Sequence, residues 1–302
     1  MATIEPPARR CVPTLDEWCA AGRTFRFRGH DIFLRTEGSG PALLLIHGFP
    51  TASWDWCKIW AGLAAQYTLI APDMLGFGFS SKPRGHAYRI AEQADVCLAA
   101  LAEMGVTEAS VLAHDYGDTV AQELLARFNA GESPVKFNSM VLLNGGLFPE
   151  THRPVLVQKL LLSPLGPLLS RFYTRDKFAQ AMRQIAGPMF PPEEADLDAG
   201  WQLLSRTDGK AAMPGLIYYM VERRQQRERW VGALQQAKLP LTVIDGMSDP
   251  ISGAHMVARC RELVPQADIV ELAGAGHYPQ LEDPGRVLPA ALAGLARRIP
   301  NS

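Results

Sequence analysis

The chain has 302 residues, of which 47% are apolar and 20% charged, the balance of an ordinary globular protein. A chain of this length and composition can bury a sizeable core, so its stability requires neither disulfides nor metal ions. Thirty basic and thirty-one acidic residues give a net charge of -1, which gives no indication of a nucleic-acid partner or of an anionic membrane surface. Charge alone therefore favours an uncharged small-molecule substrate, or no ligand at all.

The cysteines and the N-terminal segment predict a cytoplasmic location. The chain has an odd number of cysteines and no CxxC pair: Cys11, Cys19, Cys57, Cys97 and Cys260. This spacing argues against a zinc site and against a secreted disulfide framework. The N-terminus has no apolar stretch of the kind found in signal peptides, and the densest apolar run, at 42–46, is far too short to span a bilayer.

In chain order, short strand-like runs alternate with longer helical ones. Two runs, 24–29 and 30–36, predict an antiparallel pair of strands at the start of a sheet. Further apolar runs predict buried strands at 41–48, 67–73, 109–115 and 137–146. The segments between these strands predict helices at 54–66, 89–105 and 116–128.

After residue 147 the pattern changes. Residues 148–238 contain many prolines, helical stretches and no strand-like run, which predicts an inserted helical cap. Strand patterns return at 239–246 and 267–274 and are followed by a terminal helix at 286–299. Alternating strands and helices predict an α/β fold, with a mostly parallel eight-stranded sheet and helices on both faces. The core of this fold then comprises residues 24–147 and 239–300.

The junction of the strand at 109–115 and the following helix carries the strongest chemical signal. Asp115 stands at its centre, in the segment Ala113-His114-Asp115-Tyr116-Gly117. Small residues two positions before and after the central one are typical of a nucleophile elbow, a turn so tight that larger side chains would collide. The free N–H groups and the dipole of the helix N-terminus favour an ionised carboxylate there. Asp115 is therefore a candidate nucleophile.

Two further candidates follow later strands, at the sheet edge where ligands of such folds bind. Asp249 lies after the strand at 239–246, and His277 lies after the last strand. The order nucleophile, acid, histidine along the chain is that of the catalytic triad in this kind of fold. A histidine oriented by a carboxylate can accept a proton from water. Asp245 is the alternative acid, although its position within the strand pattern disfavours it.

Backbone N–H groups near Asp115 are expected to form an oxyanion hole. The segment His47-Gly48-Phe49-Pro50 ends the strand at 41–48, and the N–H of Phe49 is the expected first donor. The N–H of Tyr116, which follows Asp115 directly, is the expected second donor.

Taken together, these motifs resemble the epoxide hydrolase branch of the α/β-hydrolase superfamily. HGFPT, PDMLGFGFSSKP, HDYG, GMSDP and GHYPQLEDP occur in the family's order, and the match covers residues 24 to 299. More narrowly, HDYGDTVAQELLAR, NGGLFPETHRP and RWVGAL resemble the mesoderm-specific-transcript-like proteins. The resemblance implies an α/β-hydrolase fold with a cap and a reaction that uses no metal and no organic cofactor.

The resemblance also implies cap tyrosines that hydrogen-bond the oxygen of an epoxide. The family's cap motif matches Tyr219, with its neighbour Tyr218 as the competing choice, and Tyr173 is a candidate for the second tyrosine. Trp54 is a further candidate for contact with the substrate. The run at 222–230, which is rich in arginine, is expected to be a solvated helix face.

A carboxylate nucleophile suits a reaction at an alkyl carbon. Such a carbon has no carbonyl group for addition, so the nucleophile must displace a leaving group from it. The favoured reaction is attack by Asp115 on an epoxide, followed by hydrolysis of the resulting ester by water that His277 and Asp249 activate, which gives a vicinal diol. Water and a small, uncharged, largely apolar substrate are then the expected partners, and no metal ion is expected.

Three alternatives compete with this function. A haloalkane dehalogenase shares the aspartate, but Tyr116 stands where its tryptophan is usual and Phe49 where a polar residue is usual. An esterase is disfavoured because the chain has no GxSxG elbow. A binding protein that kept the scaffold without turnover is the third alternative. Asp118, in place of the usual second glycine after the elbow, is a further departure from the family pattern.

Overall fold

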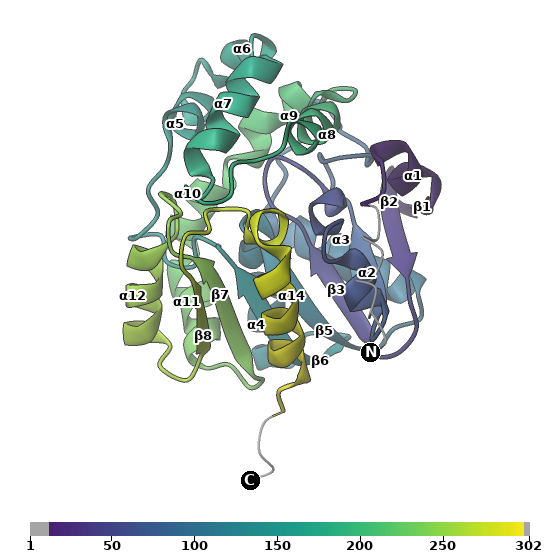
Figure 1. The fold of residues 1–302 in the computed structure, drawn as a ribbon. Coiled ribbons are helices and arrows are strands. Elements are labelled where there is room, and N and C mark those ends of the chain that lie inside the picture. The colour runs from purple at the N-terminus through teal and green to yellow at the C-terminus, as the bar shows by residue number, and fades with distance from the viewer. Residues whose placement is uncertain (1–11, 299–302) are drawn as a thin grey trace, which may run out of the picture.

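A sheet of eight strands forms the centre of the computed structural model, which describes residues 12–298 (Figure 1). Cys11 and residues 299–300 of the predicted core lie outside the described residues. The strands are β1 (Gly22–Phe27), β2 (His30–Glu37), β3 (Ala42–Ile46), β4 (Thr68–Pro72), β5 (Glu108–His114), β6 (Lys136–Leu143), β7 (Leu241–Gly246) and β8 (Asp268–Leu272). Their order across the sheet is β1-β2-β4-β3-β5-β6-β7-β8. β2 pairs antiparallel with β1 and β4, and the other neighbours are parallel, which confirms the predicted sheet.

Helices cover both faces of the sheet. They are α1 (Leu15–Ala20), α2 (Trp60–Ala64), α3 (Ile90–Glu103), α4 (Tyr116–Ala130), α11 (Arg227–Gln235), α12 (Ala254–Leu263), α13 (Pro279–Glu282) and α14 (Pro284–Ala296). Leu43 and Leu45 of β3 pack in a core with residues of α1, α2 and α14, whereas Leu44 and Ile46 pack with residues of α3, α4, α11 and α12. This alternation follows from the two-residue period of a strand. No helix in residues 12–298 is long and apolar enough to cross a membrane.

The single helix predicted at 54–66 is wrong. A 3-10 helix, η1 (Ser53–Trp56), is followed by a turn and then by the short helix α2. Residues 53–57 are all buried, so this segment does not have the one apolar face and one solvated face of an amphipathic helix. The helices α1, α12 and α13 are additional to those predicted.

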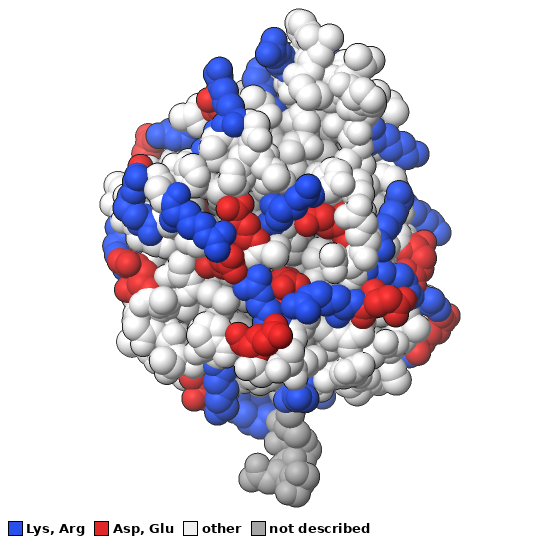
Figure 2. Space-filling model, turned by 180° about the vertical axis from the view of Figure 1, so that it is seen from behind, with Lys and Arg blue, Asp and Glu red and all other residues white. Residues whose placement is uncertain are grey.

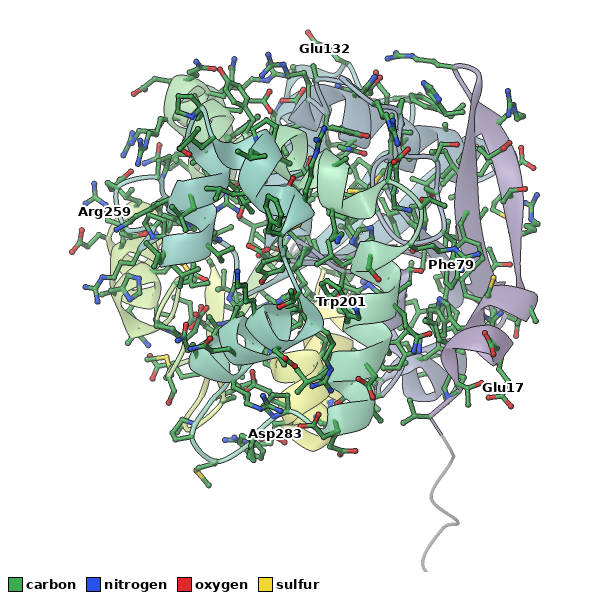
Figure 3. All side chains as sticks on the ribbon, turned by 90° about the horizontal axis from the view of Figure 1, so that it is seen from above. Glu17, Phe79, Glu132, Trp201, Arg259 and Asp283 are labelled. Carbon is green, nitrogen blue, oxygen red and sulfur yellow. The ribbon has the colours of Figure 1, made fainter. Side chains whose placement is uncertain are left out.

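The segment between β6 and β7 is helical and, in the described chain, contains no strand. Its helices before α11 are α5 (Leu156–Leu162), α6 (Gly166–Arg171), α7 (Arg175–Ile185), α8 (Glu194–Ser205), α9 (Gly209–Leu216) and α10 (Tyr219–Gln225). They lie above the carboxyl ends of the strands in Figure 1, and Figure 3 shows them over the sheet, with Trp201 of α8 near the centre of the view.

The last helix of the predicted cap range, α11, packs against α4 instead. The indole N–H of Trp230 donates to Glu123 over 2.9 Å, and the side-chain amide of Asn129 donates to the carbonyl oxygen of Ala233 over 2.9 Å. The division into core and cap stays a prediction, and these contacts favour a cap that ends before α11 rather than at residue 238.

A strained turn between β5 and α4 holds Asp115 at the edge of the sheet that the cap covers. Its backbone has φ 49° and ψ -106°, a conformation that costs a non-glycine residue about 1–3 kcal/mol. Gly117 is required because the chain passes close to β3. A Cβ atom at Gly117 would lie 2.3 Å from the carbonyl oxygen of Ile46. The small residue of the elbow pattern is therefore explained by the approach of α4 to β3.

Gly117→Ala is expected to destabilise the protein by about 1–3 kcal/mol or more, because the added methyl group meets backbone atoms that cannot move aside. Gly232, in α11, has open space around it and provides the matched control. Gly232→Ala is expected to stabilise the protein by about 0.5–1 kcal/mol through its higher helix propensity. Free energies of unfolding from urea denaturation measure both changes. Equal stability of the two variants would contradict the close approach of α4 to β3.

Candidate active site

The carboxyl group of Asp115 is buried, with only 3% of the residue exposed. The backbone N–H of Phe49, in the loop after β3, donates to Asp115 Oδ2 over 3.1 Å. Tyr116, the other expected N–H donor, is the first residue of α4. No hydrogen bond reaches Oδ1 of Asp115 from the rest of the described chain. One carboxylate oxygen is therefore held by a backbone donor, and the other is free to react.

His277 lies between Asp115 and Asp249. Its Nδ1 is 2.7 Å from Oδ2 of Asp249, a hydrogen-bond distance, and its Nε2 is 3.9 Å from Oδ1 of Asp115. The longer distance excludes a direct hydrogen bond. Because the carboxylate of Asp249 accepts from Nδ1–H, the neutral imidazole presents its proton-accepting Nε2 towards Asp115. The structure thus brings together the three residues of the predicted triad.

Asp249 is held by three further donors that the sequence analysis did not identify. The backbone N–H of Ile251 donates to its Oδ1 over 2.7 Å. The hydroxyl of Ser252 and the side-chain amide of Asn144 donate to its Oδ2 over 2.8 and 3.1 Å. Asn144 follows β6 with a φ of 42°, so an asparagine directly after a strand, before two glycines, was the available signal. These donors fix the orientation of the Asp249 carboxylate.

Two other carboxyl groups are buried near the triad without a hydrogen-bond partner in the described residues. Asp245, the alternative acid, lies inside β7, and both its side-chain oxygens are unpaired. Asp118, in the first turn of α4, is equally buried and unpaired. Burial and the charge of Asp249 raise the pKa of Asp245, and burial and the charge of Asp115 raise the pKa of Asp118. Burial therefore favours the protonated form of both groups.

The charges of the triad stabilise one another. Burial alone would raise the pKa of Asp115, but the positive charges of His277 and Arg223 outweigh it and leave that pKa below its ordinary value. Burial alone would lower the pKa of His277, but the carboxylates of Asp249 and Asp115 raise it well above the ordinary value. The pKa of Asp249 is lowered by His277 against the effect of burial. The two carboxylates and the charged form of the His277 imidazole therefore stabilise one another.

Arg223 of α10 is the main residue of the site that the sequence analysis missed. It belongs to the run at 222–230 that was expected to be solvated, yet it is only 2% exposed, so that expectation is wrong at this position. Its Nε donates to the hydroxyl of Thr119 over 2.6 Å, and one terminal nitrogen donates to the backbone oxygen of Asp115 over 3.1 Å. The same nitrogen lies 4.0 Å from Asp115 Oδ1. Arg223 therefore places a cation of the cap beside the candidate nucleophile.

Tyr219, the expected cap tyrosine, is fully buried beside Arg223. The guanidinium of Arg223 lies 4.4 Å from the centre of the Tyr219 ring, a cation–π contact. The ring is also 4.9 Å from that of Tyr116 and 6.5 Å from that of Phe49. Its hydroxyl has no hydrogen-bond partner in the described residues, and burial together with the charge of Asp115 raises its pKa. Tyr219 thus keeps its proton and has an unused donor.

A cavity of about 50 Å³ opens on Asp115 and His277. Tyr173, between α6 and α7, lines it, and burial raises the pKa of this tyrosine to about 12. Most of the other lining side chains are apolar: Phe49, Pro50, Val155, Val157, Leu161, Phe178, Ala181, Met182, Ile185, Met213 and Ile251. No group of three or more side chains suited to a metal ion occurs in residues 12–298. The cavity suits a narrow, uncharged group.

Three of the predicted substrate contacts do not line this cavity. Tyr219 is buried beside it, with its ring 6.5 Å from that of the lining residue Phe49. Tyr218 packs under the guanidinium of Arg89, whose centre is 4.5 Å from the tyrosine ring, and does not line the cavity. Trp54 lines a neighbouring cavity of about 200 Å³. Phe178 and Met182 line both cavities and form the wall between them. Tyr218 and Trp54 were predicted from their position in motifs, and a motif does not specify which way a side chain points.

Asp249→Asn is expected to lower the pKa of His277 by about one unit or more, because it removes the adjacent negative charge. The midpoint of the imidazole titration, followed by NMR, then moves to lower pH. Asp245→Asn is the matched control. Since burial favours the neutral form of Asp245, its replacement is expected to leave the midpoint unchanged. A shift caused by Asp245→Asn alone would reverse the assignment of the acid.

Comparison with known proteins places this chain in a family. Residues 41–284 match a family model whose description is alpha/beta hydrolase fold. The mesoderm-specific transcript homolog protein of Bos taurus is 40% identical over 295 residues, which cover 94% of this chain and 88% of the relative. A putative hydrolase of Mycobacterium tuberculosis, LipZ, is 37% identical over 282 residues, which cover 93% of this chain and 98% of the relative.

Solved structures agree at the level of the fold. The epoxide hydrolase CorEH aligns with a TM-score of 0.73 at 20% identity, over 91% of this chain and 98% of the other. A loop variant of a haloalkane dehalogenase from Bradyrhizobium elkanii aligns with a TM-score of 0.75 at 21% identity, over 91% and 96%. The family match and the two relatives confirm the resemblance drawn from the motifs. The chain belongs to the α/β-hydrolase fold family, and it is similar to the mesoderm-specific transcript proteins over almost its whole length.

Proposed function

We propose that this chain is an epoxide hydrolase that uses Asp115 as its nucleophile and forms a vicinal diol. The observation that carries the proposal is the buried carboxylate of Asp115, with the N–H of Phe49 on one oxygen and His277 3.9 Å from the other. A nucleophile, a proton acceptor and a hydrogen-bond donor thus meet at one apolar cavity. This arrangement supports a reaction on a small, uncharged, largely apolar substrate.

In the first step, Oδ1 of Asp115 attacks a ring carbon of the epoxide, and the bond from that carbon to the ring oxygen breaks. The oxygen leaves with the electron pair and takes a proton from one of the tyrosines that donate to it. Tyr219 and Tyr173 are the proposed hydrogen-bond donors to it, and their raised pKa values keep both phenols protonated. The product is an ester of Asp115 with a hydroxyalkyl group.

In the second step, His277 accepts a proton from water while the water oxygen attacks the carbonyl carbon of the ester. Asp249 orients the imidazole and stabilises the imidazolium that forms. Negative charge develops on Oδ2 of Asp115, where the N–H of Phe49 donates, and the N–H of Tyr116 is the proposed second donor. Each such donor typically lowers the barrier by about 3 kcal/mol. The intermediate collapses as the leaving alkoxide takes the proton from the His277 imidazolium, and the diol is released. The Asp115 carboxyl group then loses its proton, which returns through solvent to the tyrosine that donated in the first step, so one epoxide and one water are consumed.

Dehalogenation of a haloalkane is the competing reaction, since it uses the same nucleophile and the same ester. The solved epoxide hydrolase and the solved dehalogenase are about equally similar to this chain, so overall fold does not separate the two activities. Side-chain chemistry favours the epoxide. Phe49 offers no side-chain donor to a departing halide, whereas Tyr219 supplies a buried, unpaired hydroxyl that suits an oxygen leaving group.

Asp115→Ala is expected to reduce diol formation from a panel of epoxides, styrene oxide included, by about 10⁴-fold or more, because the variant has no nucleophile. His277→Gln is expected to carry out the first step and to fail in the second. The ester then accumulates, and the intact mass of the protein increases by the mass of one epoxide molecule. Asp245→Asn is the control and keeps its activity.

The outcomes that contradict the proposal are equally specific. Diol formation that survives Asp115→Ala would exclude the ester mechanism. Halide release from haloalkanes, with no diol from any epoxide of the panel, would favour dehalogenation. No reaction with either class of substrate would favour a binding protein on an α/β-hydrolase scaffold.

Arg223→Met is expected to lower kcat by about 10- to 100-fold with little change in KM. A hydrogen bond from a charged donor contributes about 1.5–3 kcal/mol, and Arg223 acts on the turn at Asp115 without lining the cavity. Arg224→Met, the exposed neighbour on the same helix, is the matched control and should leave kcat unchanged. Steady-state rates of diol formation give kcat and KM for both variants and for the wild type. An Arg223→Met enzyme with wild-type kcat would mean that the contact has no role in the reaction.

A further inference from the structure

One part of the cap presents an unusual amount of apolar surface. We call residues 155–173, which contain α5 and α6, the α5–α6 hairpin. Eight large apolar side chains are exposed in residues 12–298, and six of them lie in this hairpin: Leu156, Leu160, Leu165, Leu168, Leu169 and Phe172. Leu156 is 71% exposed and Phe172 is 64% exposed. A cluster of exposed apolar side chains on a protein surface is typical of an interaction site.

The charged side chains of this segment have one sign. Residues 151–175 contain no aspartate and no glutamate. Arg153, Lys159 and Arg171 are exposed there, and none of them forms a salt bridge within the described residues. In Figure 1 the hairpin lies at the end of the molecule farthest from the C-terminus, and in Figure 2 the uppermost tip is mainly white with blue beside it. Apolar side chains flanked by unpaired cations are typical of a surface that contacts anionic lipid.

A cavity lies between this surface and the active site. It has a volume of about 350 Å³ and is lined by residues of α5, α6 and α7, including the exposed Leu156 and Phe172. Five of its lining residues also line the cavity at Asp115: Val155, Val157, Leu161, Tyr173 and Ala181. The two cavities are therefore adjacent, separated by side chains of the hairpin and α7.

We propose that the α5–α6 hairpin docks on the surface of an anionic phospholipid membrane and that apolar substrate passes from the lipid through the cap cavity to Asp115. The leucines and the phenylalanine enter the headgroup region, and Lys159 and Arg171 contact the lipid phosphates. Docking depends only on the hairpin, whereas delivery of substrate rests on the proposed function. The protein would then belong on the membrane without crossing it.

A second copy of the chain fits the same surface less well. In a symmetric dimer the two hairpins would face each other, and the like charges of Lys159, Arg171 and Arg153 would lie on both sides of the contact. Repulsion between like charges opposes such an interface, whereas anionic phosphates neutralise these side chains. The absence of acidic residues between 151 and 175 leaves the hairpin no charge complementary to itself.

Flotation of the full chain with lipid vesicles tests the proposal. Vesicles of phosphatidylcholine with phosphatidylglycerol are compared with vesicles of phosphatidylcholine alone. Leu165→Ser/Leu168→Ser removes two exposed leucines that do not line the cap cavity. This variant is expected to bind anionic vesicles about tenfold or more weakly.

Lys159→Gln/Arg171→Gln is expected to weaken binding by a similar factor, with a loss of the salt dependence. Met189→Ser, a 68% exposed apolar residue outside the hairpin, is the matched control and leaves binding unchanged.

Three results would overturn the proposal. In the first, the wild-type chain does not float with anionic vesicles. In the second, the Leu165→Ser/Leu168→Ser variant floats with them as well as the wild type does. In the third, light scattering shows that the wild type is a dimer and that this variant is a monomer. Diol formation from a water-soluble epoxide is measured on the same samples. Flotation without diol formation would support the docking surface and contradict the proposed function. Diol formation without flotation would support the proposed function and contradict the docking surface.

Discussion

The buried negative charge of Asp115 is the constraint on which the rest of the site depends. An ionised carboxylate in a protein interior costs several kcal/mol unless neighbouring groups replace its hydration. Here the replacements come from three separate parts of the chain: the N–H of Phe49 after β3, the imidazolium of His277 after β8, and the guanidinium of Arg223 on α10. The last of these belongs to the segment inserted between β6 and β7. That segment is therefore tied to the core by charge as well as by apolar packing, and a movement of α10 would change the environment of Asp115.

Sequence patterns located the parts of the site that depend on a strand end or a turn. The elbow at Asp115 and the loops of Asp249 and His277 each follow an apolar run, so a local pattern specifies them. Arg223 could not be found in this way, since it meets Asp115 across 108 positions of the chain and stands beside an arginine that is exposed. The same limit explains why Tyr218 and Trp54 were predicted to contact the substrate although neither lines the cavity at Asp115. A motif gives the position of a side chain along the chain, and only packing decides which cavity it reaches.

The net charge of the whole chain likewise gave no indication of the basic segment that contains the α5–α6 hairpin. A value of -1 for the whole chain conceals a segment, residues 151–175, in which every charged side chain is basic. The acidic residues that balance the total lie elsewhere, many of them in ion pairs such as that of Glu150 with Arg227 and Arg259. Because electrostatic attraction is screened beyond about 8–10 Å at physiological salt, a surface responds to its local charge and not to the sum. The average over 302 residues therefore says little about what the α5–α6 hairpin contacts.

Four carboxyl groups lie in or beside the site, and their surroundings divide them into two kinds. Asp115 and Asp249 each have a cation or several hydrogen-bond donors, which lower their pKa values. Asp118 and Asp245 have no hydrogen-bond partner among the described residues, and burial together with the nearby charge of Asp115 or Asp249 raises their pKa values. Such a division assigns the charge of a site to particular residues. Two carboxylates then face the imidazole of His277 and the guanidinium of Arg223, so the charged side chains of the site are paired with one another rather than with an ionic substrate. That balance favours a neutral molecule, as the apolar lining of the cavity does.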